Sequence, residues 1–216
     1  MTSTVTIDVV SDLVCPWCFL GMKRLQRALS LLPGINAEVR WRPFQLDPTI
    51  PPQGMDRKTY MLNKFGDPAR IEATHLRLEQ LGAEEGIDFK FAAIKISPNT
   101  LDAHRVIRWA MNPGFQNEVA AALFARYFER GENIGAREVL VEVAAEAGMD
   151  RSVVETLLAT DAEVSDVREE IETAGRMGIT GVPCFIIAGQ YALMGAQPAE
   201  TLADAIAKAA VGAPLV

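Results

Sequence analysis

The stretch that decides the fold is residues 4–18, TVTIDVVSDLVCPWC. Thr4 to Val10 alternates in polarity and is rich in β-branched residues, which predicts a strand. Cys18 to Leu32 carries apolar residues at helical spacing, and Pro33-Gly34 ends the predicted helix. Ile35 to Phe44 alternates again. This part of the chain is therefore predicted to form a β-α-β unit with two parallel strands.

The period of the pattern changes again near the other end of the chain. Cys184 to Ala188 (CFIIA) predicts a strand, Gly189-Gln190 a two-residue hairpin turn, and Tyr191 to Met194 a second strand. Pro198 to Ala210 predicts a closing helix with proline in its first turn. These elements give a β-β-α unit that cannot form a stable sheet alone.

The middle of the chain is predicted to be helical. From Asp56 to about Thr160 the pattern is helical almost throughout, and Val164 to Met177 adds another helix. We therefore expect an α/β fold, with an all-helical insertion between a β-α-β half and a β-β-α half. The expected domains are residues 1–54 with 165–216, which are discontinuous, and an inserted helical domain at residues 55–164.

Composition and charge narrow the class of protein. The chain has 216 residues, 49% of them hydrophobic and 23% charged, which is typical of a globular protein. The formal net charge of −7 argues against nucleic acid or an anionic membrane as a partner. The first residues lack Lys and Arg, and Asp8 and Asp12 interrupt their apolar run, so we expect no secretory signal and a cytoplasmic location.

The chemistry is expected at Cys15-Pro16-Trp17-Cys18, at a strand-to-helix junction. Helix N-terminal amides favour an anion there, and so favour a thiolate on Cys15, the more exposed thiol. Cys18, one turn into the helix, can attack a mixed disulfide on Cys15 and release a substrate. A Cys-x-x-Cys motif beside a βαβ pattern indicates a thioredoxin-like redox site.

Two other interpretations of the cysteines stay open. A structural zinc ion could use Cys15, Cys18, Cys184 and His104, although zinc sites usually combine two close ligand pairs and no second pair exists here. The two neighbouring cysteines could also be inert and buried. Cys184 itself is either a third exchangeable thiol or, as its apolar neighbours favour, a small core residue.

A second element, Thr180-Gly181-Val182-Pro183, stands just before the late strand. A proline is permitted at the first residue of a strand because its missing N–H is not needed there. We expect this loop to fold back beside the cysteine helix, where the Val182 backbone could pair with a substrate chain. A plain turn is the alternative.

Taken together, these motifs resemble those of the DsbA-like thioredoxin-fold proteins, and more closely the FrnE-like branch, known as polyketide-biosynthesis dithiol–disulfide isomerases. The segments that carry the resemblance are SDLVCPWCFLG (11–21), WRPFQLDP (41–48), SPNTLDAHR (97–105), LFARYFERGENI (123–134) and GITGVPCFIIAGQYALMGAQ (178–197).

The resemblance implies a thioredoxin fold, with Cys15 as nucleophile, Cys18 as resolving thiol and Pro183 in the cis form. Pro16, Trp17 and Val182 would contact substrate. The stretch with Asn99, Thr100 and His104 would lie on an inserted helix that faces the site. No cofactor follows beyond the redox dithiol, and no metal.

Several polar and aromatic residues have a plainer interpretation beside the functional one. His104 could assist proton transfer, but a histidine on a helix is more often structural. Asp8 or Asp12 could accept the Cys18 proton, although Asp12 could simply cap the following turn and Asp8 face water. Trp17, Phe19, Phe44 and Leu46 could rim a shallow apolar groove for substrate. Trp17 is expected to turn outward, whereas Phe19 and Phe44 are more often core residues.

The function that this sequence predicts is that of a cytosolic thiol–disulfide oxidoreductase or isomerase, an enzyme whose redox-active disulfide forms between Cys15 and Cys18. Its expected partners are protein or small-molecule disulfides, with glutathione as one candidate reductant, and the chain could be a monomer or a homodimer. One alternative is a glutathione-dependent transferase or isomerase, similar to kappa-class transferases and 2-hydroxychromene-2-carboxylate isomerases, which typically place Ser at position 15. Another is a redox-independent, chaperone-like peptide binder.

Overall fold

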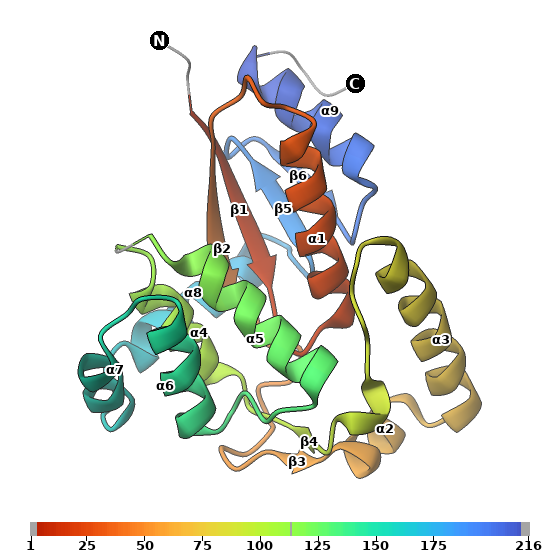
Figure 1. The fold of residues 1–216 in the computed structure, drawn as a ribbon, viewed down its shortest axis with the longest axis vertical. Coiled ribbons are helices and arrows are strands. Elements are labelled where there is room, and N and C mark those ends of the chain that lie inside the picture. Colours follow the sequence, from red (N-terminus) through yellow and green to blue (C-terminus); the bar gives the residue numbers. More distant parts are fainter. Residues whose placement is uncertain (1–3, 113, 213–216) are drawn as a thin grey trace.

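The computed structural model describes residues 4–112 and 114–212, and its centre is a mixed sheet with strand order β2-β1-β5-β6 (Figure 1). β1 (Val5–Ser11) and β2 (Ala37–Pro43) are parallel and are joined by helix α1 (Pro16–Ser30). β5 (Cys184–Ile187) runs antiparallel to β1. The predicted thioredoxin-like fold with a helical insertion is confirmed.

The alternation of β1 decides which helices cover the sheet. Val5, Ile7 and Val9 are buried and belong to the main core, together with residues of α1 and of α9 (Ala199–Ala210). The next residue, Val10, packs instead with Ala174 of α8 (Val164–Arg176). α1 and α9 therefore cover one face of the sheet, and α8 covers part of the other.

The hairpin near the C-terminal end differs slightly from the prediction. β6 (Tyr191–Met194) does pair with β5, but Ile187 pairs with Tyr191, so the connection has three residues rather than two. Ala188 and Gly189 both have positive φ, 52° and 66°. The sequence marked only Gly189 as suited to that conformation, which is why the shorter turn was expected.

The insertion supplies a rim of helices around one end of the sheet. Its helices are α2 (Arg57–Phe65), α3 (Pro68–Glu84), α4 (Leu101–Trp109), α5 (Gln116–Arg130), α6 (Arg137–Glu146) and α7 (Arg151–Leu158). The expectation that this part is helical almost throughout was wrong for the stretch before α4. There the chain forms a 3-10 turn, Phe91–Ala93, and a two-residue strand, β4 (Ile96–Ser97), that pairs with β3 (Met55–Asp56).

An aromatic cluster joins the insertion to the sheet. Phe19 of α1 stacks on Phe124 of α5 with ring centroids 5.3 Å apart, and Phe128 of α5 stacks nearby. Phe89 meets both Phe19 and Phe128 edge-on. The boundary of the inserted domain at residues 55–164 stays a prediction, because both parts share this core.

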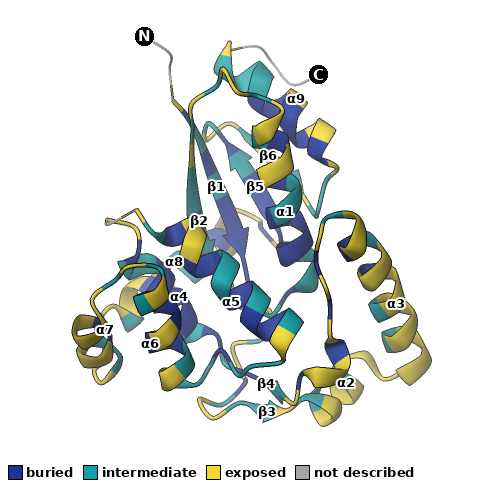
Figure 2. Ribbon diagram, in the orientation of Figure 1, coloured by how far each residue is buried: buried dark blue, intermediate teal, exposed yellow. Residues whose placement is uncertain are grey.

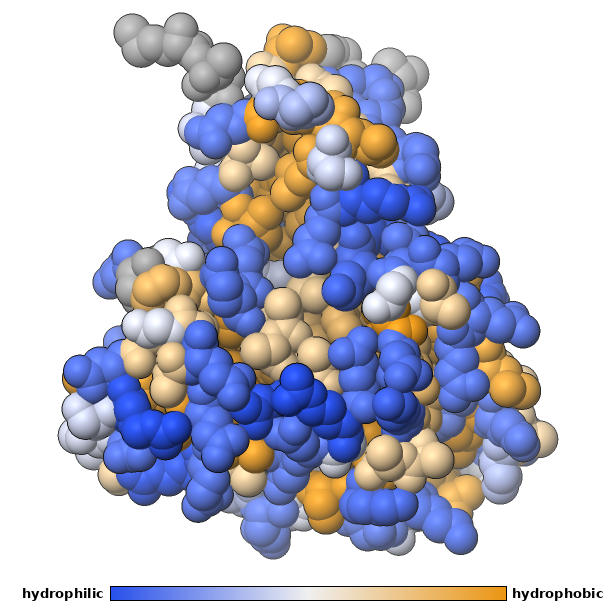
Figure 3. All heavy atoms as spheres, viewed as in Figure 1, coloured by the Kyte–Doolittle hydropathy of each residue, from blue (hydrophilic) through white to orange (hydrophobic). Residues whose placement is uncertain are grey.

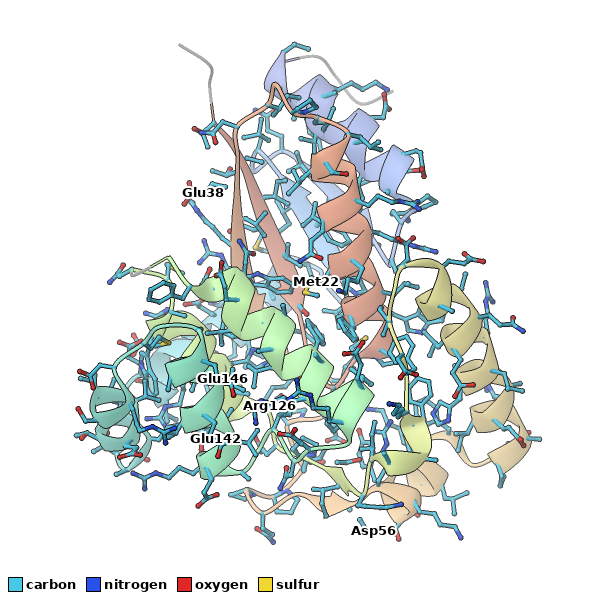
Figure 4. All side chains as sticks on the ribbon, viewed as in Figure 1. Met22, Glu38, Asp56, Arg126, Glu142 and Glu146 are labelled. Carbon is cyan, nitrogen blue, oxygen red and sulfur yellow. The ribbon has the colours of Figure 1, made fainter. Side chains whose placement is uncertain are left out.

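An ion-pair cluster fixes the outer layer of the insertion. The buried guanidinium of Arg126 on α5 reaches Glu132, Glu142 and Glu146 at 2.8, 3.0 and 2.6 Å, and Figure 4 shows Glu142 and Glu146 pointing at it from α6. These carboxylates hold the pKa of Arg126 above its usual range, against the opposing effect of burial. These ion pairs hold α6 against α5.

The surface is uneven in its exposure. Figure 2 shows that α2 and α3 are mostly exposed, whereas α1 and α5 turn broad buried faces inward. Figure 3 shows an apolar strip over the upper part of the molecule, where α1 ends and the chain leads to β2. Leu31, which is 53% exposed, and the half-buried Leu32 and Ile35 belong to the segment that joins α1 to β2. The strip is at the opposite end of α1 from the cysteines.

Within the described residues, no helix is both long and apolar enough to cross a bilayer.

Candidate active site

The cysteine pair lies where β1 leads into α1. Cys15 is the N-cap residue of α1, with extended backbone angles, and Pro16 starts the helix. The Cys15 N–H donates to the carbonyl of Asp12 at 3.0 Å, which closes the turn after the strand. The Cys15 side chain therefore stands at the positive end of the helix dipole, as the motif predicts.

The structure buries Cys18, as its place one turn into the helix predicts, and it also buries Cys15, which was expected to be more exposed. Cys15 is 4% exposed and Cys18 1% exposed, and all three cysteines of the chain are free thiols. The order of exposure agrees with the sequence, but Cys15 is not open to solvent. The reason is that the loop before β5 lies across it.

That loop brings Val182 and Pro183 to the cysteines. The Val182–Pro183 peptide bond is cis, as the resemblance implies, and the Cys15 Sγ–H donates to the Val182 carbonyl at 3.7 Å. The pairing of Val10 with Cys184 across β1 and β5 fixes this approach. Cys15 and Val182 are 167 positions apart in the sequence, and the sheet makes them neighbours.

Gly21 permits this close packing, and sequence reasoning missed it. A Cβ added to Gly21 would lie 3.0 Å from Pro183 Cγ and 3.1 Å from Phe185 Cζ. Only a residue without a side chain lets α1 approach the loop this closely. A glycine inside an apolar helical pattern was the available signal.

The environment of Cys18 keeps it protonated. Burial raises the pKa of the Cys18 thiol well above its ordinary value, and the neighbouring Cys15 raises it further. Contact with the Ser11 side chain and the Asp12 N–H acts in the opposite direction. Cys18 is therefore a thiol that must lose a proton before it can attack.

Asp12 does not cap the turn, so that interpretation was wrong. Its Oδ2 accepts from the Leu46 N–H at 2.8 Å, and its Oδ1 lies 3.5 Å from Nε2 of His104. The cap position is held by Cys15, which makes no side-chain cap bond. The carboxylate instead links the cysteine turn to the chain that follows β2.

His104 is buried behind the cysteine turn, and Asn99 is half-buried at the start of the same helix region. His104, on α4, is buried, and its Nε2 lies 2.9 Å from the Phe44 carbonyl. Asn99 precedes α4; its amide donates to the Ile50 carbonyl at 2.6 Å and its Oδ1 accepts from the Leu101 N–H. These bonds attach the proline-rich loop to α4. Direct substrate contact by either side chain stays a prediction.

Trp17 is half-buried rather than fully turned outward. The guanidinium carbon of Arg77 on α3 lies 5.9 Å from the Trp17 ring centroid. Leu46 is exposed, whereas Phe19 belongs to the core. Trp17 therefore contacts α3, and an apolar substrate groove that Trp17 forms with Leu46 stays a prediction.

Asp8 and Cys184 lie on the opposite side of the sheet from the motif. Asp8 alternates with the core-facing Ile7 and Val9, and its Oδ1 accepts from Arg42 Nε at 2.6 Å. Cys184 is fully buried in the smaller core cluster with Val10, and burial raises the pKa of its thiol. Among the described residues, no group of three or more His, Cys, Asp or Glu side chains is arranged to hold a metal ion.

Comparisons with known proteins found a family model, a related sequence and solved structures that are similar to this chain. A family model described as a DSBA-like thioredoxin domain matches residues 6–207. The uncharacterised protein YwbO of Bacillus subtilis (strain 168) is 30% identical over 207 residues, covering 94% of this chain and 96% of that protein. The crystal structure of a probable DsbA oxidoreductase from Streptomyces coelicolor is 30% identical, with a TM-score of 0.87 over 98% of this chain and 93% of that one. A 2-hydroxychromene-2-carboxylate isomerase shares the fold at 16% identity, with a TM-score of 0.71 over 94% and 95% of the two chains.

Proposed function

Because this chain belongs to the DSBA-like thioredoxin domain family, we propose that it is a thiol–disulfide oxidoreductase that works through Cys15 and Cys18. The observation that carries the proposal is the position of the Cys15 sulfur. It stands at the start of α1 and 3.7 Å from the Val182 carbonyl, beside Pro183. A thiolate is favoured at that place, and a substrate chain can lie along the Val182 backbone.

The reaction needs two exchange steps. The Cys15 thiolate attacks one sulfur of a substrate disulfide, the substrate S–S bond breaks, and the departing thiolate takes a proton from solvent. Cys18 then loses its proton and attacks the Cys15 sulfur. A Cys15–Cys18 disulfide forms, the second substrate sulfur leaves as a thiolate, and the protein has given two electrons to the substrate. A thiol reductant of the glutathione class resets the pair.

The remaining parts of the proposal concern context. We place the chain in the FrnE-like branch, on the segments at residues 97–105 and 178–197. We propose the cytoplasm as its compartment, where free thiols stay reduced. Trapping thiols rapidly in cells would find Cys15 and Cys18 mainly reduced; a mainly oxidised pair would contradict that compartment.

Insulin reduction with dithiothreitol tests the chemistry. The wild-type protein is expected to accelerate precipitation of the insulin chains, and Cys15→Ala to abolish the effect. Cys18→Ala is expected to accumulate a mixed disulfide on Cys15, visible by mass spectrometry. Cys184→Ala is the matched control, since that thiol lies in the other core cluster, and it should retain activity. Equal activity of wild type and Cys15→Ala would refute the proposal.

The fold of the isomerase relative keeps a glutathione-dependent reaction as the second candidate. That candidate predicts that Cys15→Ser still transfers glutathione to a test electrophile. The chaperone-like alternative predicts that the protein with both Cys15→Ala and Cys18→Ala still protects a cysteine-free client from aggregation. The redox function requires both variants to be inert in these assays.

A further inference from the structure

Two polar atoms just before the cysteine motif are buried without a hydrogen-bond partner of normal geometry. They are Ser11 Oγ and Asp12 Oδ1, and their residues are 2% and 1% exposed. Buried polar atoms are nearly always paired, so an unpaired atom beside a reacting group calls for a functional reason. The Ser11 hydroxyl faces the Cys18 sulfur and favours its ionised form.

The histidine that meets Asp12 lies between that carboxylate and the Phe44 carbonyl. His104 is 4% exposed, and its Nε2 must carry a hydrogen because its partner, the Phe44 carbonyl, can only accept. The basic nitrogen of the neutral ring is therefore Nδ1. Protonation there would make an imidazolium whose Nε2 lies 3.5 Å from the unpaired oxygen of Asp12. The carboxylate would stabilise that charge.

A small cavity connects Ser11 with His104. It has a volume of about 10 Å³, room for about one water molecule, and both residues line it. It lies at the end of β2, where α4 and α8 meet that strand (Figure 1).

The cavity leads away from the substrate side of the molecule. Arg42, Arg108 and Glu170 line it and also line a groove of about 510 Å³ on the α8 side of the sheet. Arg108 pairs with Glu170, and Arg42 lies 3.8 Å from the same carboxylate. Charged side chains thus separate the cavity from an open, solvent-filled groove.

Resting on the proposed dithiol function, we propose that Ser11, a water molecule in this cavity and His104 carry the proton of Cys18 away during resolution, with Asp12 stabilising the protonated His104. While the mixed disulfide exists, the substrate covers the side of Cys15 that faces Val182. The proton of Cys18 therefore leaves on the other side, toward the cavity. The Cys18 proton passes to His104 Nδ1, and the Cys18 sulfur forms its bond to Cys15. The substrate sulfur leaves as a thiolate, and His104 then releases its proton through the groove.

The relay has identifiable charged neighbours. Asp12 faces His104 from the turn after β1, Arg42 from β2, Arg108 from its own helix and Glu170 from α8. The two arginines disfavour an additional positive charge in the cavity, and the two carboxylates favour it. In this relay His104 acts on Cys18 through Ser11 and the water molecule.

A chromogenic disulfide separates the two steps. Reduced protein, in a Cys184→Ala background, is mixed with dithiobis-nitrobenzoate, which releases one coloured thiolate when Cys15 attacks and a second when Cys18 resolves. His104→Gln can still donate to the Phe44 carbonyl but cannot take a proton. We expect it to slow the second release about tenfold or more at about pH 7 and to leave the first unchanged.

The pH dependence distinguishes a relay from a merely structural role. The deficit of His104→Gln should narrow as pH rises, because solvent then removes the Cys18 proton directly. Ser11→Ala should show the same pattern, and His75→Gln, at the other histidine, should match the parent. A second phase within about twofold of the parent, or a deficit constant with pH, would overturn the relay. Loss of the first release in the parent would instead count against the dithiol function itself.

Discussion

Replacing Gly21 with alanine has two opposing effects on the free energy of unfolding, and both come from the added Cβ atom. Alanine is favoured over glycine within a helix by up to about 1 kcal/mol. The added Cβ, however, would meet Pro183 Cγ at 3.0 Å and Phe185 Cζ at 3.1 Å, both shorter than ordinary van der Waals contact. Overpacking of this kind costs about 1–3 kcal/mol.

The neighbours decide which effect is larger. Phe185 is fully buried in the main core and cannot move aside without disturbing it. Pro183 is the softer neighbour, because it lies in a loop, but it stands beside the Cys15 sulfur. We therefore expect Gly21→Ala to lower the free energy of unfolding by about 1 kcal/mol net, or about 3 °C in Tm. The first release from the chromogenic disulfide should also slow, because Val182 and Pro183 are displaced from Cys15.

A matched glycine provides the control. Gly175, in the last turn of α8, has nothing within 4 Å of an added Cβ, so Gly175→Ala should stabilise the protein by up to about 1 kcal/mol. Urea unfolding of both variants measures the free energies. A Gly21→Ala protein at least as stable as wild type, with an unchanged first release, would refute the packing argument.

Three further perturbations have defined outcomes. Arg105→Met should lower the free energy of unfolding by about 3 kcal/mol in urea, because the buried guanidinium donates to the carbonyls of Leu157, Thr160 and Ala162; a change below about 1 kcal/mol would contradict this. Burial raises the pKa of Cys18 in the folded chain, so the reduced protein should keep its full stability below about pH 8.5 and lose some as pH rises further. As pH rises above that value, the urea midpoint should fall more for the wild type than for Cys18→Ala. An equal fall in both proteins would exclude Cys18 as the cause. Trp17→Ala should raise KM for a peptide disulfide about tenfold in steady-state assays with kcat little changed, since it removes an aromatic rim; an unchanged KM would remove Trp17 from the substrate site.

The elements predicted well are those whose pattern is local. The alternation of residues 5–10 and the Pro33-Gly34 stop are features that a short window reveals, and β1, α1 and β2 follow them closely. The β3–β4 pair was missed because two residues per strand are too few to show a period of two. The two strands are far apart in the sequence and meet only because α2 and α3, which lie between them, fold back.

The cysteine pair of the candidate site could be located from the sequence, and the residues that surround it could not. The spacing of Cys15 and Cys18 indicates a dithiol. The position of Pro183 just before a predicted strand indicated that its loop lies beside the cysteines. The burial of His104 against Asp12 depends on how α4 docks beside β2, which no local pattern encodes. The same holds for the shielding of Cys15 by a loop from the far end of the chain.

The separation of the site's two halves has a consequence during translation. At about 5–20 residues per second, a ribosome needs about 8–33 s to add the 167 positions between Cys15 and Val182. Throughout that interval β1 has no β5 beside it, and the nascent thiols are unshielded. The cover that Val182 and Pro183 give to Cys15 therefore forms only after the last strands have been made.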